Sequence, residues 1–374
     1  MGKAKIICVA TGIFPPDTGG PAKFAETFLT WCQQNGQRVE VVSFTDTATK
    51  DILFENSNVK LISRNQSLLN RYIKTIFALS RKLLTKRAII ANGLFLEVYF
   101  ASLLTNRNYV CKVPGDIVWE RARNSGYTGK SLTEFQNETL SARYKLFRNL
   151  FSRSLKRANK VIVPTRQLQE LCIGWGVRSE RILVIPNSVD TLLFSSDEST
   201  KPLFDVISVG RLIGLKNVKE VIHACTELNL SLAVVGDGPE RSSLEGVARE
   251  LSSNTVFFGD EKQENVLKLL QSSSCFVLNS SGEGGTPYSL LEARSVGLFS
   301  IATQGTGSSE VINHLVDGLL CGKNGPTLRE ALEIFVRDKP FVYEAKEKAI
   351  MDTRIRFDSR IQFKRIRNVV IGEL

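Results

Sequence analysis

A short segment between Ser281 and Glu292 (SGEGGTPYSLLE) combines glycines, hydroxyl side chains and a carboxylate. It follows an apolar run, 275–278, that is typical of a buried strand, and it predicts a turn that opens a helix. Glycines let a ligand approach the backbone, and the N–H groups at the start of a helix attract anions. The Glu292 carboxylate can accept hydrogen bonds from hydroxyl groups. We therefore expect this segment to bind phosphates and hydroxyls; the alternative is an ordinary strand-to-helix loop.

Two cations, Arg211 and Lys216, follow another predicted strand, 205–209. Arginine offers a planar fork of donors, and lysine offers a point charge. Because both residues belong to one loop at the end of a strand, we expect them to clamp a diphosphate. The alternative is a pair of solvated surface cations.

Two further glycine-rich turns follow predicted strands. Gly19 and Gly20 precede a predicted helix, 22–34, and could present N–H groups to a phosphate or hydroxyl, or form a purely structural turn. The turn that begins at Gly236 has Arg241 where the third glycine of a dinucleotide-binding motif would lie. We expect it to shape a tight turn that contacts a base or a phosphate.

The first half of the chain offers a different set of side chains after the predicted strand 109–113. Asp116, Trp119 and Glu120 follow this strand closely and could line the opposite wall of a ligand cleft. Glu120 could equally form a local salt bridge with Arg121 or Arg123. Neither histidine of the chain occupies a position that suits a catalytic histidine.

Short apolar runs alternate with longer amphipathic ones, including a long helix expected at 133–157, which indicates an α/β fold with parallel sheets. The series starts again near Pro186, and 374 residues exceed what one hydrophobic core usually serves. We therefore predict two doubly wound, Rossmann-like domains that face a central cleft. Their expected ranges are 1–190 and 191–357, with a basic helix at 358–374 that packs back on the first domain.

The formal charge of +11 is unevenly placed. Two stretches, 63–87 and 141–160, each carry seven Lys or Arg residues and no acid, and both interleave these with apolar residues at roughly helical spacing. Basic amphipathic helices suit an anionic membrane surface or another polyanion; the alternative is two solvated helix faces. No nucleic-acid-binding motif accompanies the charge, so we expect no nucleic-acid partner.

The seven cysteines are scattered and form no CxxC pair, which favours a reduced, cytoplasmic compartment and argues against a zinc site. No apolar run reaches the roughly 18 residues that a membrane-spanning helix needs. We expect a cytoplasmic protein with a peripheral place on the inner face of the cytoplasmic membrane.

Several ordered motifs resemble the retaining, GT-B-fold glycosyltransferases of family 4, also called glycosyltransferase group 1. The resemblance covers nearly the whole chain, and the order of the motifs is more specific than any one of them. The motifs are the Pro15-Pro-x-x-Gly-Gly20 turn, Ile185–Asp190 with Phe194, Val209–Leu212 with Lys216, Val235–Glu240, and Glu283–Ala293, continued by Glu310 and Asp317-Gly318.

This resemblance implies a nucleotide-diphosphate sugar, of UDP or GDP type, held by the second domain. Arg211 and Lys216 would neutralise its diphosphate, and Glu292 would bind the ribose hydroxyls. Glu283 or its neighbours would contact the donor sugar. The further donor-binding residues implied are Gly19, Gly20, Gly236, Gly284, Gly285, Thr286, Pro287, Tyr288 and Ser289.

The resemblance also implies a reaction: transfer of a hexose-type unit, with retention of configuration, to a lipid-linked or polysaccharide acceptor. Asp116, Glu283, Arg211 and Lys216 would carry the chemistry, and no metal or other cofactor is required. Asp116, Trp119 and Glu120 would form the acceptor side. Surface glycan or glycolipid synthesis, including lipopolysaccharide, is the expected process.

Two departures from the family pattern bear on the site. Eight residues lie between Glu283 and Glu292, one more than the family's usual spacing, so Gly284 occupies the usual position of the first glutamate. The first half also lacks the histidine that many members carry in the acceptor loop, where this chain has Asp116. The alternatives are therefore a GT-B-fold sugar-nucleotide epimerase and a catalytically degenerate scaffold member.

Overall fold

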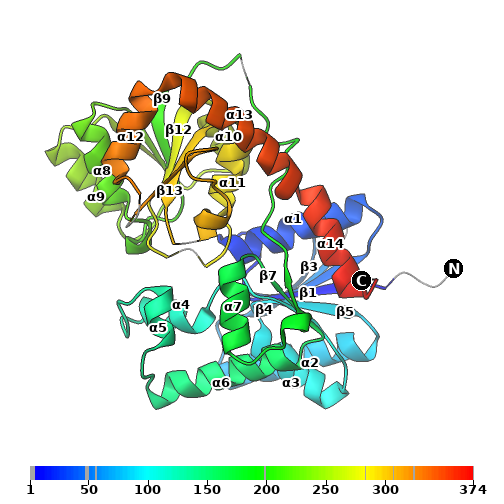
Figure 1. Ribbon diagram of the computed structural model, residues 1–374. Coiled ribbons are helices and arrows are strands. Elements are labelled where there is room, and N and C mark those ends of the chain that lie inside the picture. Colours follow the sequence, from blue (N-terminus) through cyan, green and yellow to red (C-terminus); the bar gives the residue numbers. More distant parts are fainter. Residues whose placement is uncertain are drawn as a thin grey trace. The chain divides into compact units, whose positions relative to one another are not determined.

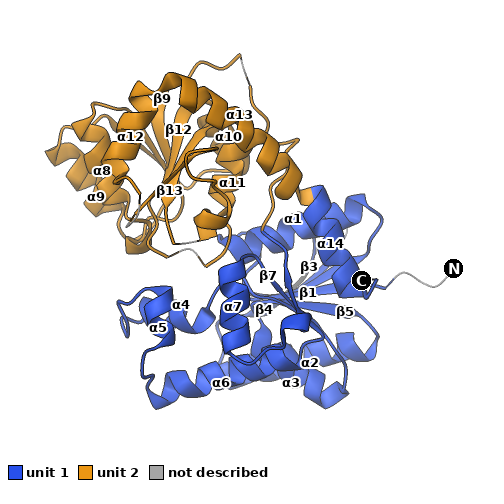
Figure 2. Ribbon diagram, in the orientation of Figure 1, with its two compact units in different colours: residues 1–186, 360–374 blue, residues 187–359 orange. Residues whose placement is uncertain are grey.

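The chain folds into two compact units, each built on a β-sheet with helices on both faces (Figure 1, Figure 2). The computed structural model describes residues 5–46, 50–54, 57–197, 199–282, 284–305, 307–322 and 325–373. Unit 1 comprises Met1–Pro186 and Arg360–Leu374, and unit 2 comprises Asn187–Ser359. The segment 187–190, expected in the first domain, belongs to unit 2 because Asn187 hydrogen-bonds to Thr286 and Val189 pairs with Asp358.

Unit 1 contains an eight-stranded sheet in its described residues, with the order β3-β4-β2-β1-β5-β6-β7-β8. The paired strands run parallel except β3, which is antiparallel to β4. The strands are β1 (Ile7–Thr11), β2 (Val39–Thr45), β3 (Lys50–Phe54), β4 (Ser57–Ser63), β5 (Ala88–Asn92), β6 (Val110–Lys112), β7 (Lys160–Val163) and β8 (Ile182–Val184). The helices are α1 (Gly20–Gln34), α2 (Leu68–Leu84), α3 (Phe95–Thr105), α4 (Ile117–Asn124), α5 (Leu132–Gln136), α6 (Ala142–Arg157) and α7 (Arg166–Gly174).

The last helix, α14 (Ser359–Ile371), returns to unit 1 and packs on α1. The Phe363 ring lies 5.5 Å from that of Phe28 and 6.0 Å from that of Trp31. Lys5 Nζ donates to Ile371 O at 2.7 Å. An aromatic cluster therefore holds α14 against α1.

Unit 2 contains a parallel six-stranded sheet in its described residues, ordered β11-β10-β9-β12-β13-β14. Its two faces carry separate hydrophobic cores, as a doubly wound sheet requires. The strands are β9 (Phe204–Val209), β10 (Leu232–Val235), β11 (Thr255–Gly259), β12 (Ser273–Leu278), β13 (Phe299–Thr303) and β14 (Leu319–Cys321). The helices are α8 (Val218–Glu227), α9 (Arg241–Glu250), α10 (Gln263–Gln271), α11 (Tyr288–Ser295), α12 (Leu328–Arg337) and α13 (Lys339–Arg356).

The prediction of a single long helix at 133–157 is wrong, because two helices, α5 and α6, occupy this range. Ser131 and Glu134 form a capping box that starts α5, and the helix ends at Asn137. Ser141 takes an extended conformation as the N-cap of α6. The backbone between Asn137 and Ser141 thus interrupts a continuous amphipathic pattern.

Among the residues that the structure describes, no helix is both long and apolar enough to cross a bilayer. The seven cysteines are buried and free of disulfides.

Candidate functional site

Most of the residues expected to bind the donor lie in unit 2, in the loops at one edge of its sheet or at the start of α11, whereas Gly19 and Gly20 lie in unit 1. Because β9, β10, β12 and β13 are parallel, the loops that follow them meet at the carboxyl ends of the strands. Ser281 N donates to Leu215 O at 2.9 Å, which joins the loops after β12 and β9. Leu212 N donates to Asp237 O at 2.9 Å, which joins the loops after β9 and β10. The sheet therefore brings together motifs that are separated by about 70 residues along the chain.

Gly236 allows the loops after β9 and β10 to touch. Its φ is +128°, and a Cβ at this position would overlap Gly210 O. Gly210 N in turn donates to Val235 O at 2.9 Å. Gly236 thus shapes the tight turn that the sequence predicts, since any side chain there would separate the two loops.

Arg211 and Lys216 occupy the loop after β9. Arg211 is exposed, whereas Lys216 is half-buried at the end of a short 3-10 helix, Gly214–Lys216. The Lys216 side chain folds back over the strand end, since a Cβ added to Gly210 would lie 3.6 Å from Lys216 Cε. Both cations therefore belong to the carboxyl edge of the sheet, where the sequence predicts a diphosphate clamp.

The loop before α11 is anchored on both sides. Asn187 N donates to Thr286 Oγ1 at 2.8 Å, and Asn187 Nδ2 donates to Thr286 O at 2.9 Å. A Cβ at Gly307 would overlap Gly285 O, so the loop after β13 lies directly against this segment. Thr286 is thus buried, with its hydroxyl and carbonyl oxygens bound to Asn187. Glu283 lies outside the described residues.

The N-terminus of α11 suits an anion. Pro287 is its N-cap and supplies no side-chain hydrogen bond, and the first turn contains no acidic residue. Tyr288 and Ser289, which begin the helix, are both half-buried. Gly284, in the loop before the helix, is half-buried as well. An uncapped helix N-terminus presents backbone N–H groups and a positive dipole end.

Glu292 lies on the second turn of α11 and is only 4% exposed. Tyr288 precedes it by one helical turn, and burial together with the Glu292 carboxylate raises the pKa of the Tyr288 hydroxyl. The tyrosine therefore stays protonated beside the carboxylate. Glu292 thus lies on the helix that follows the glycine-rich loop, which is where the sequence predicts a residue that binds hydroxyl groups.

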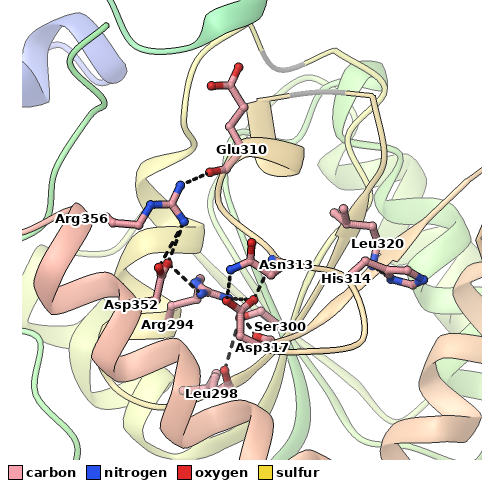
Figure 3. Close-up of polar contacts among 10 residues, drawn as sticks. All are labelled: Arg294, Leu298, Ser300, Glu310, Asn313, His314, Asp317, Leu320, Asp352 and Arg356. Atoms are coloured by element: carbon pink, nitrogen blue, oxygen red, sulfur yellow. Dashed lines mark hydrogen bonds and ion pairs between the residues drawn. The ribbon is translucent and has the colours of Figure 1, made fainter.

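An ionic cluster around the buried Arg294 fixes one side of α11 (Figure 3). Arg294 is fully buried, and its Nη1 lies 3.1 Å from Asp317 Oδ1 and 2.9 Å from Asp317 O. Its Nη2 lies 3.5 Å from Asp352 Oδ2 on α13. In the same cluster Arg356 donates to the backbone oxygen of Glu310, whose carboxyl group points away from it (Figure 3). This cluster ties α11 to the structure behind it, so Glu292 is held on a rigid element.

The glycine pair of unit 1 forms the start of α1. Gly19 has φ +140° and is the N-cap, without a side-chain hydrogen bond, and Gly20 is the first helical residue. Asn92 Nδ2 donates to Pro21 O at 3.0 Å, which holds the first turn against the end of β5. The two glycines therefore belong to unit 1, whereas the other motifs expected to bind the donor belong to unit 2.

Asp116 has a structural role within unit 1. It is 1% exposed, and its Oδ1 caps α4 by accepting from Val118 N at 2.9 Å and from Trp119 N at 3.2 Å. Its Oδ2 accepts from Gln136 Nε2 at 3.0 Å and lies 3.8 Å from Arg148 Nη2. Both oxygens are occupied by groups of the same unit. An acceptor could reach this carboxylate only by displacing one of them.

The other two predicted acceptor residues differ in exposure. Trp119 is buried, and its Nε1 donates to Lys130 O at 3.0 Å. Glu120 is exposed on α4, and its carboxylate lies close to Gly115, where an added Cβ would overlap it. Glu120 is therefore the accessible member of the set.

Two buried titratable residues of unit 1 were not predicted from the sequence. Lys112, at the end of β6, is 2% exposed and lies 4.4 Å from the Phe24 ring, and burial lowers its pKa to about 7. Glu97, on the first turn of α3, is also buried, and burial raises its pKa. Both interrupt apolar runs in the sequence, which is the signal that could have found them.

Replacing Lys112 with methionine should stabilise unit 1 in a pH-dependent way. Because the folded pKa is lowered, protonated Lys112 opposes folding below pH 7, and this penalty fades as the pH rises toward the unfolded value. The free-energy gain in Lys112→Met should therefore shrink by about 1.4 kcal/mol per pH unit between pH 7 and 9. Denaturant unfolding followed by tryptophan fluorescence measures it, since Trp31, Trp119 and Trp175 all belong to unit 1.

The exposed Lys145 provides the matched control. Lys145→Met should change the free energy of unfolding by a small amount that does not vary over this pH range. A pH-independent gain in Lys112→Met would show that Lys112 is charged in the folded unit at pH 9.

Comparison with known proteins assigns a family to both halves of the chain. Residues 18–192 match the family described as Glycosyltransferase Family 4, and residues 191–352 match the family described as Glycosyl transferases group 1. The two matches together span the motifs of the chain, except for the first residues of the Pro15–Gly20 turn.

Two curated relatives share part of the sequence. The chain is 27% identical over 214 residues to an amylovoran biosynthesis glycosyltransferase, AmsK, of Erwinia amylovora, a match that covers 51% of each chain. It is 33% identical over 146 residues to a lipopolysaccharide core biosynthesis glycosyltransferase, LpsD, of Rhizobium meliloti, covering 34% of this chain and 42% of the relative. The chain thus spans about half the length, or less, of these relatives.

A solved structure extends the likeness to the whole fold. Anabaena Alr3699/HepE, in complex with UDP and glucose, superposes with a TM-score of 0.77 at 18% identity and covers 99% of this chain and 100% of its own. At this identity the likeness concerns the fold alone. With two α/β units, motifs in the same order and a family match in each half, the chain belongs to the group 1, family 4 glycosyltransferases and has their GT-B fold.

Proposed function

We propose that the protein transfers a sugar from a nucleotide-diphosphate sugar to a lipid-linked or polysaccharide acceptor in surface glycan or glycolipid synthesis. The observation that carries this proposal is the carboxyl edge of unit 2, where hydrogen bonds hold two cations and the uncapped start of α11 in adjoining loops. Relatives named for amylovoran and lipopolysaccharide synthesis support the choice of acceptor class.

In this proposal the donor diphosphate binds between the cations and the helix N-terminus. Arg211 and Lys216 neutralise the charge that grows on the leaving phosphate as its bond to the anomeric carbon breaks, so no metal is needed. Glu292 accepts hydrogen bonds from the ribose hydroxyls. Glu283 or Gly284 contacts the donor sugar.

We also propose that the reaction retains the anomeric configuration. The acceptor hydroxyl attacks the anomeric carbon from the face that the phosphate leaves, and the leaving phosphate takes the acceptor proton. This route requires no nucleophile from the protein. It agrees with Asp116, a carboxylate already engaged in capping α4.

A panel of UDP- and GDP-sugars tests the proposal. One donor should raise the melting temperature and be consumed only when an acceptor from a membrane extract is present, and NMR of the product should show the anomeric configuration of the donor. Conversion of the donor without an acceptor would identify an epimerase. If no donor binds or is consumed, the transferase proposal fails.

The helix pair α2 and α3 supports a place at an anionic membrane surface. Apolar side chains on one stripe of α2 point to solvent, with Phe77 63% exposed, and α3 packs beside it with exposed apolar residues of its own. Lys74 and Arg81 of α2 are exposed as well. Apolar side chains that insert and cations that bind anionic headgroups are the two parts of an interfacial helix. The exposed apolar residues are Leu68, Leu69, Ile73, Phe77 and Leu84 of α2 and Phe100, Leu103 and Leu104 of α3.

The double variant Ile73→Ser/Phe77→Ser should bind anionic vesicles roughly 100-fold more weakly than the wild type, because two inserting side chains are lost. Vesicle co-sedimentation at low and high salt measures this. Met351→Ser/Ile355→Ser is the matched control, since these residues are equally exposed and also four positions apart, on α13. Equal binding of wild type to neutral and anionic vesicles would contradict the proposed surface.

A further inference from the structure

A surface cavity of about 540 Å³ opens between α4 and α6 in unit 1. Its size lies within the range of small-molecule sites. The lining residues are Arg121, Asn124, Ser125, Arg143, Tyr144 and Phe147. This lining contains no acid, two arginines, two aromatic rings and three groups that can hydrogen-bond to a hydroxyl.

The aromatic floor of this cavity is ordered by hydrogen bonds. Tyr144 is 9% exposed, and its hydroxyl lies 2.7 Å from Ser125 Oγ, which itself donates to Ala122 O at 2.9 Å. The Tyr127 ring lies 4.5 Å from the Tyr144 ring. The floor therefore has a fixed shape before any ligand binds.

Each of the two arginines lies beside an aromatic ring. Arg121 Cζ lies 4.4 Å from the centre of the Phe147 ring, and Arg143 Cζ lies 6.0 Å from that of Tyr144. Neither guanidinium group makes a hydrogen bond or an ion pair with any residue that the structure describes. Stacking on an aromatic face leaves the N–H edge of a guanidinium group available for an anion.

We propose that this cavity binds the phosphate or pyrophosphate group of a phosphorylated saccharide. Guanidinium forks bind phosphate oxygens in pairs, and two of them match the charge of a pyrophosphate. The Asn124 amide and the Ser125 hydroxyl can hydrogen-bond to the sugar, and the aromatic floor can pack against its apolar face. The assignment of this ligand as the acceptor of the reaction rests on the proposed transferase function. Its binding to the cavity can be measured without turnover.

Inorganic pyrophosphate is the probe, titrated by calorimetry into the full chain with UDP in excess to occupy the donor site. Arg121→Gln and Arg143→Gln should each weaken pyrophosphate binding about 10-fold or more, since each removes one charged donor group. Arg153→Gln is the matched control, because Arg153 is exposed on the same helix and lies outside the cavity. It carries the same charge change and should leave the binding unchanged.

Two results would overturn the proposal: no saturable pyrophosphate binding, or equal weakening in Arg143→Gln and Arg153→Gln. A second arm distinguishes a saccharide phosphate from a lipid headgroup. If anionic vesicles displace pyrophosphate, and Arg143→Gln lowers vesicle binding to the same extent, the ligand is a headgroup and the saccharide assignment fails. Because Arg143 is exposed, its variant should keep the wild-type melting temperature.

This test can fail separately from the proposed function. If transfer is observed but pyrophosphate does not bind, only the cavity assignment is lost. If pyrophosphate binds but no sugar nucleotide is consumed, the cavity stands without the transferase. If both hold, Arg143→Gln should raise the KM for the acceptor and leave the KM for the donor unchanged.

Discussion

Lys216→Ala is expected to lower kcat/KM for sugar transfer at least about 100-fold. In the proposed reaction Lys216 stabilises the negative charge that develops as the diphosphate leaves, and one such contact contributes roughly 3 kcal/mol to the transition state. The lysine is well placed for this role, because it lies over Gly210 at the end of β9 and the same loop is hydrogen-bonded to the segment before α11. Initial rates with the donor found in the sugar-nucleotide panel measure the effect.

Lys219, exposed on the first turn of α8, is the matched control. Lys219→Ala removes the same charge three residues away and should keep nearly full activity. The comparison also separates the transferase from a degenerate scaffold, whose cellular function would survive Lys216→Ala. Equal rates for the two variants would remove Lys216 from the mechanism.

Asp317→Ala should destabilise unit 2 by about 3 to 5 kcal/mol, the usual cost of leaving a buried charge without its partner. Arg294 is fully buried, and its shortest ion-pair contact is the one to Asp317 (Figure 3). The same carboxylate accepts from Asn313 N at 2.8 Å and from Asn313 Nδ2 at 2.7 Å. Truncation therefore leaves the buried Arg294 guanidinium without its nearest carboxylate and removes the acceptor of both Asn313 donors.

Hydrogen–deuterium exchange of peptides from unit 2 measures this loss and separates it from unit 1. Glu250→Ala, an exposed acid at the end of α9, is the control and should leave the exchange rates unchanged. The donor affinity of Asp317→Ala should fall as well, because Arg294 and Glu292 share α11. Unchanged protection in Asp317→Ala would mean that the cluster contributes little to stability.

Much of the fold is predictable because local patterns determine it. The strands of both sheets follow apolar runs, and the glycine-rich segments follow strand ends, so the residue pattern alone predicts the carboxyl edge of unit 2. Four strands escape prediction. Two of them, β8 and β14, contain three residues each, too few for a periodic pattern, and the other two are β3 and β4. The break between α5 and α6 lies between the C-cap Asn137 and the extended backbone of Ser141, which amphipathic spacing does not reveal.

The amino-acid sequence by itself determined the family, the parallel α/β architecture and the segments that carry Arg211, Lys216 and Glu292, because these depend on residue type and spacing. Only the tertiary structure decided which polar side chains are already engaged. Asp116 is bound by Gln136 and by Arg148, which lie 20 and 32 residues farther along the chain. Such partners meet only when the helices pack, since burial and hydrogen bonding between distant segments leave no local trace in the sequence.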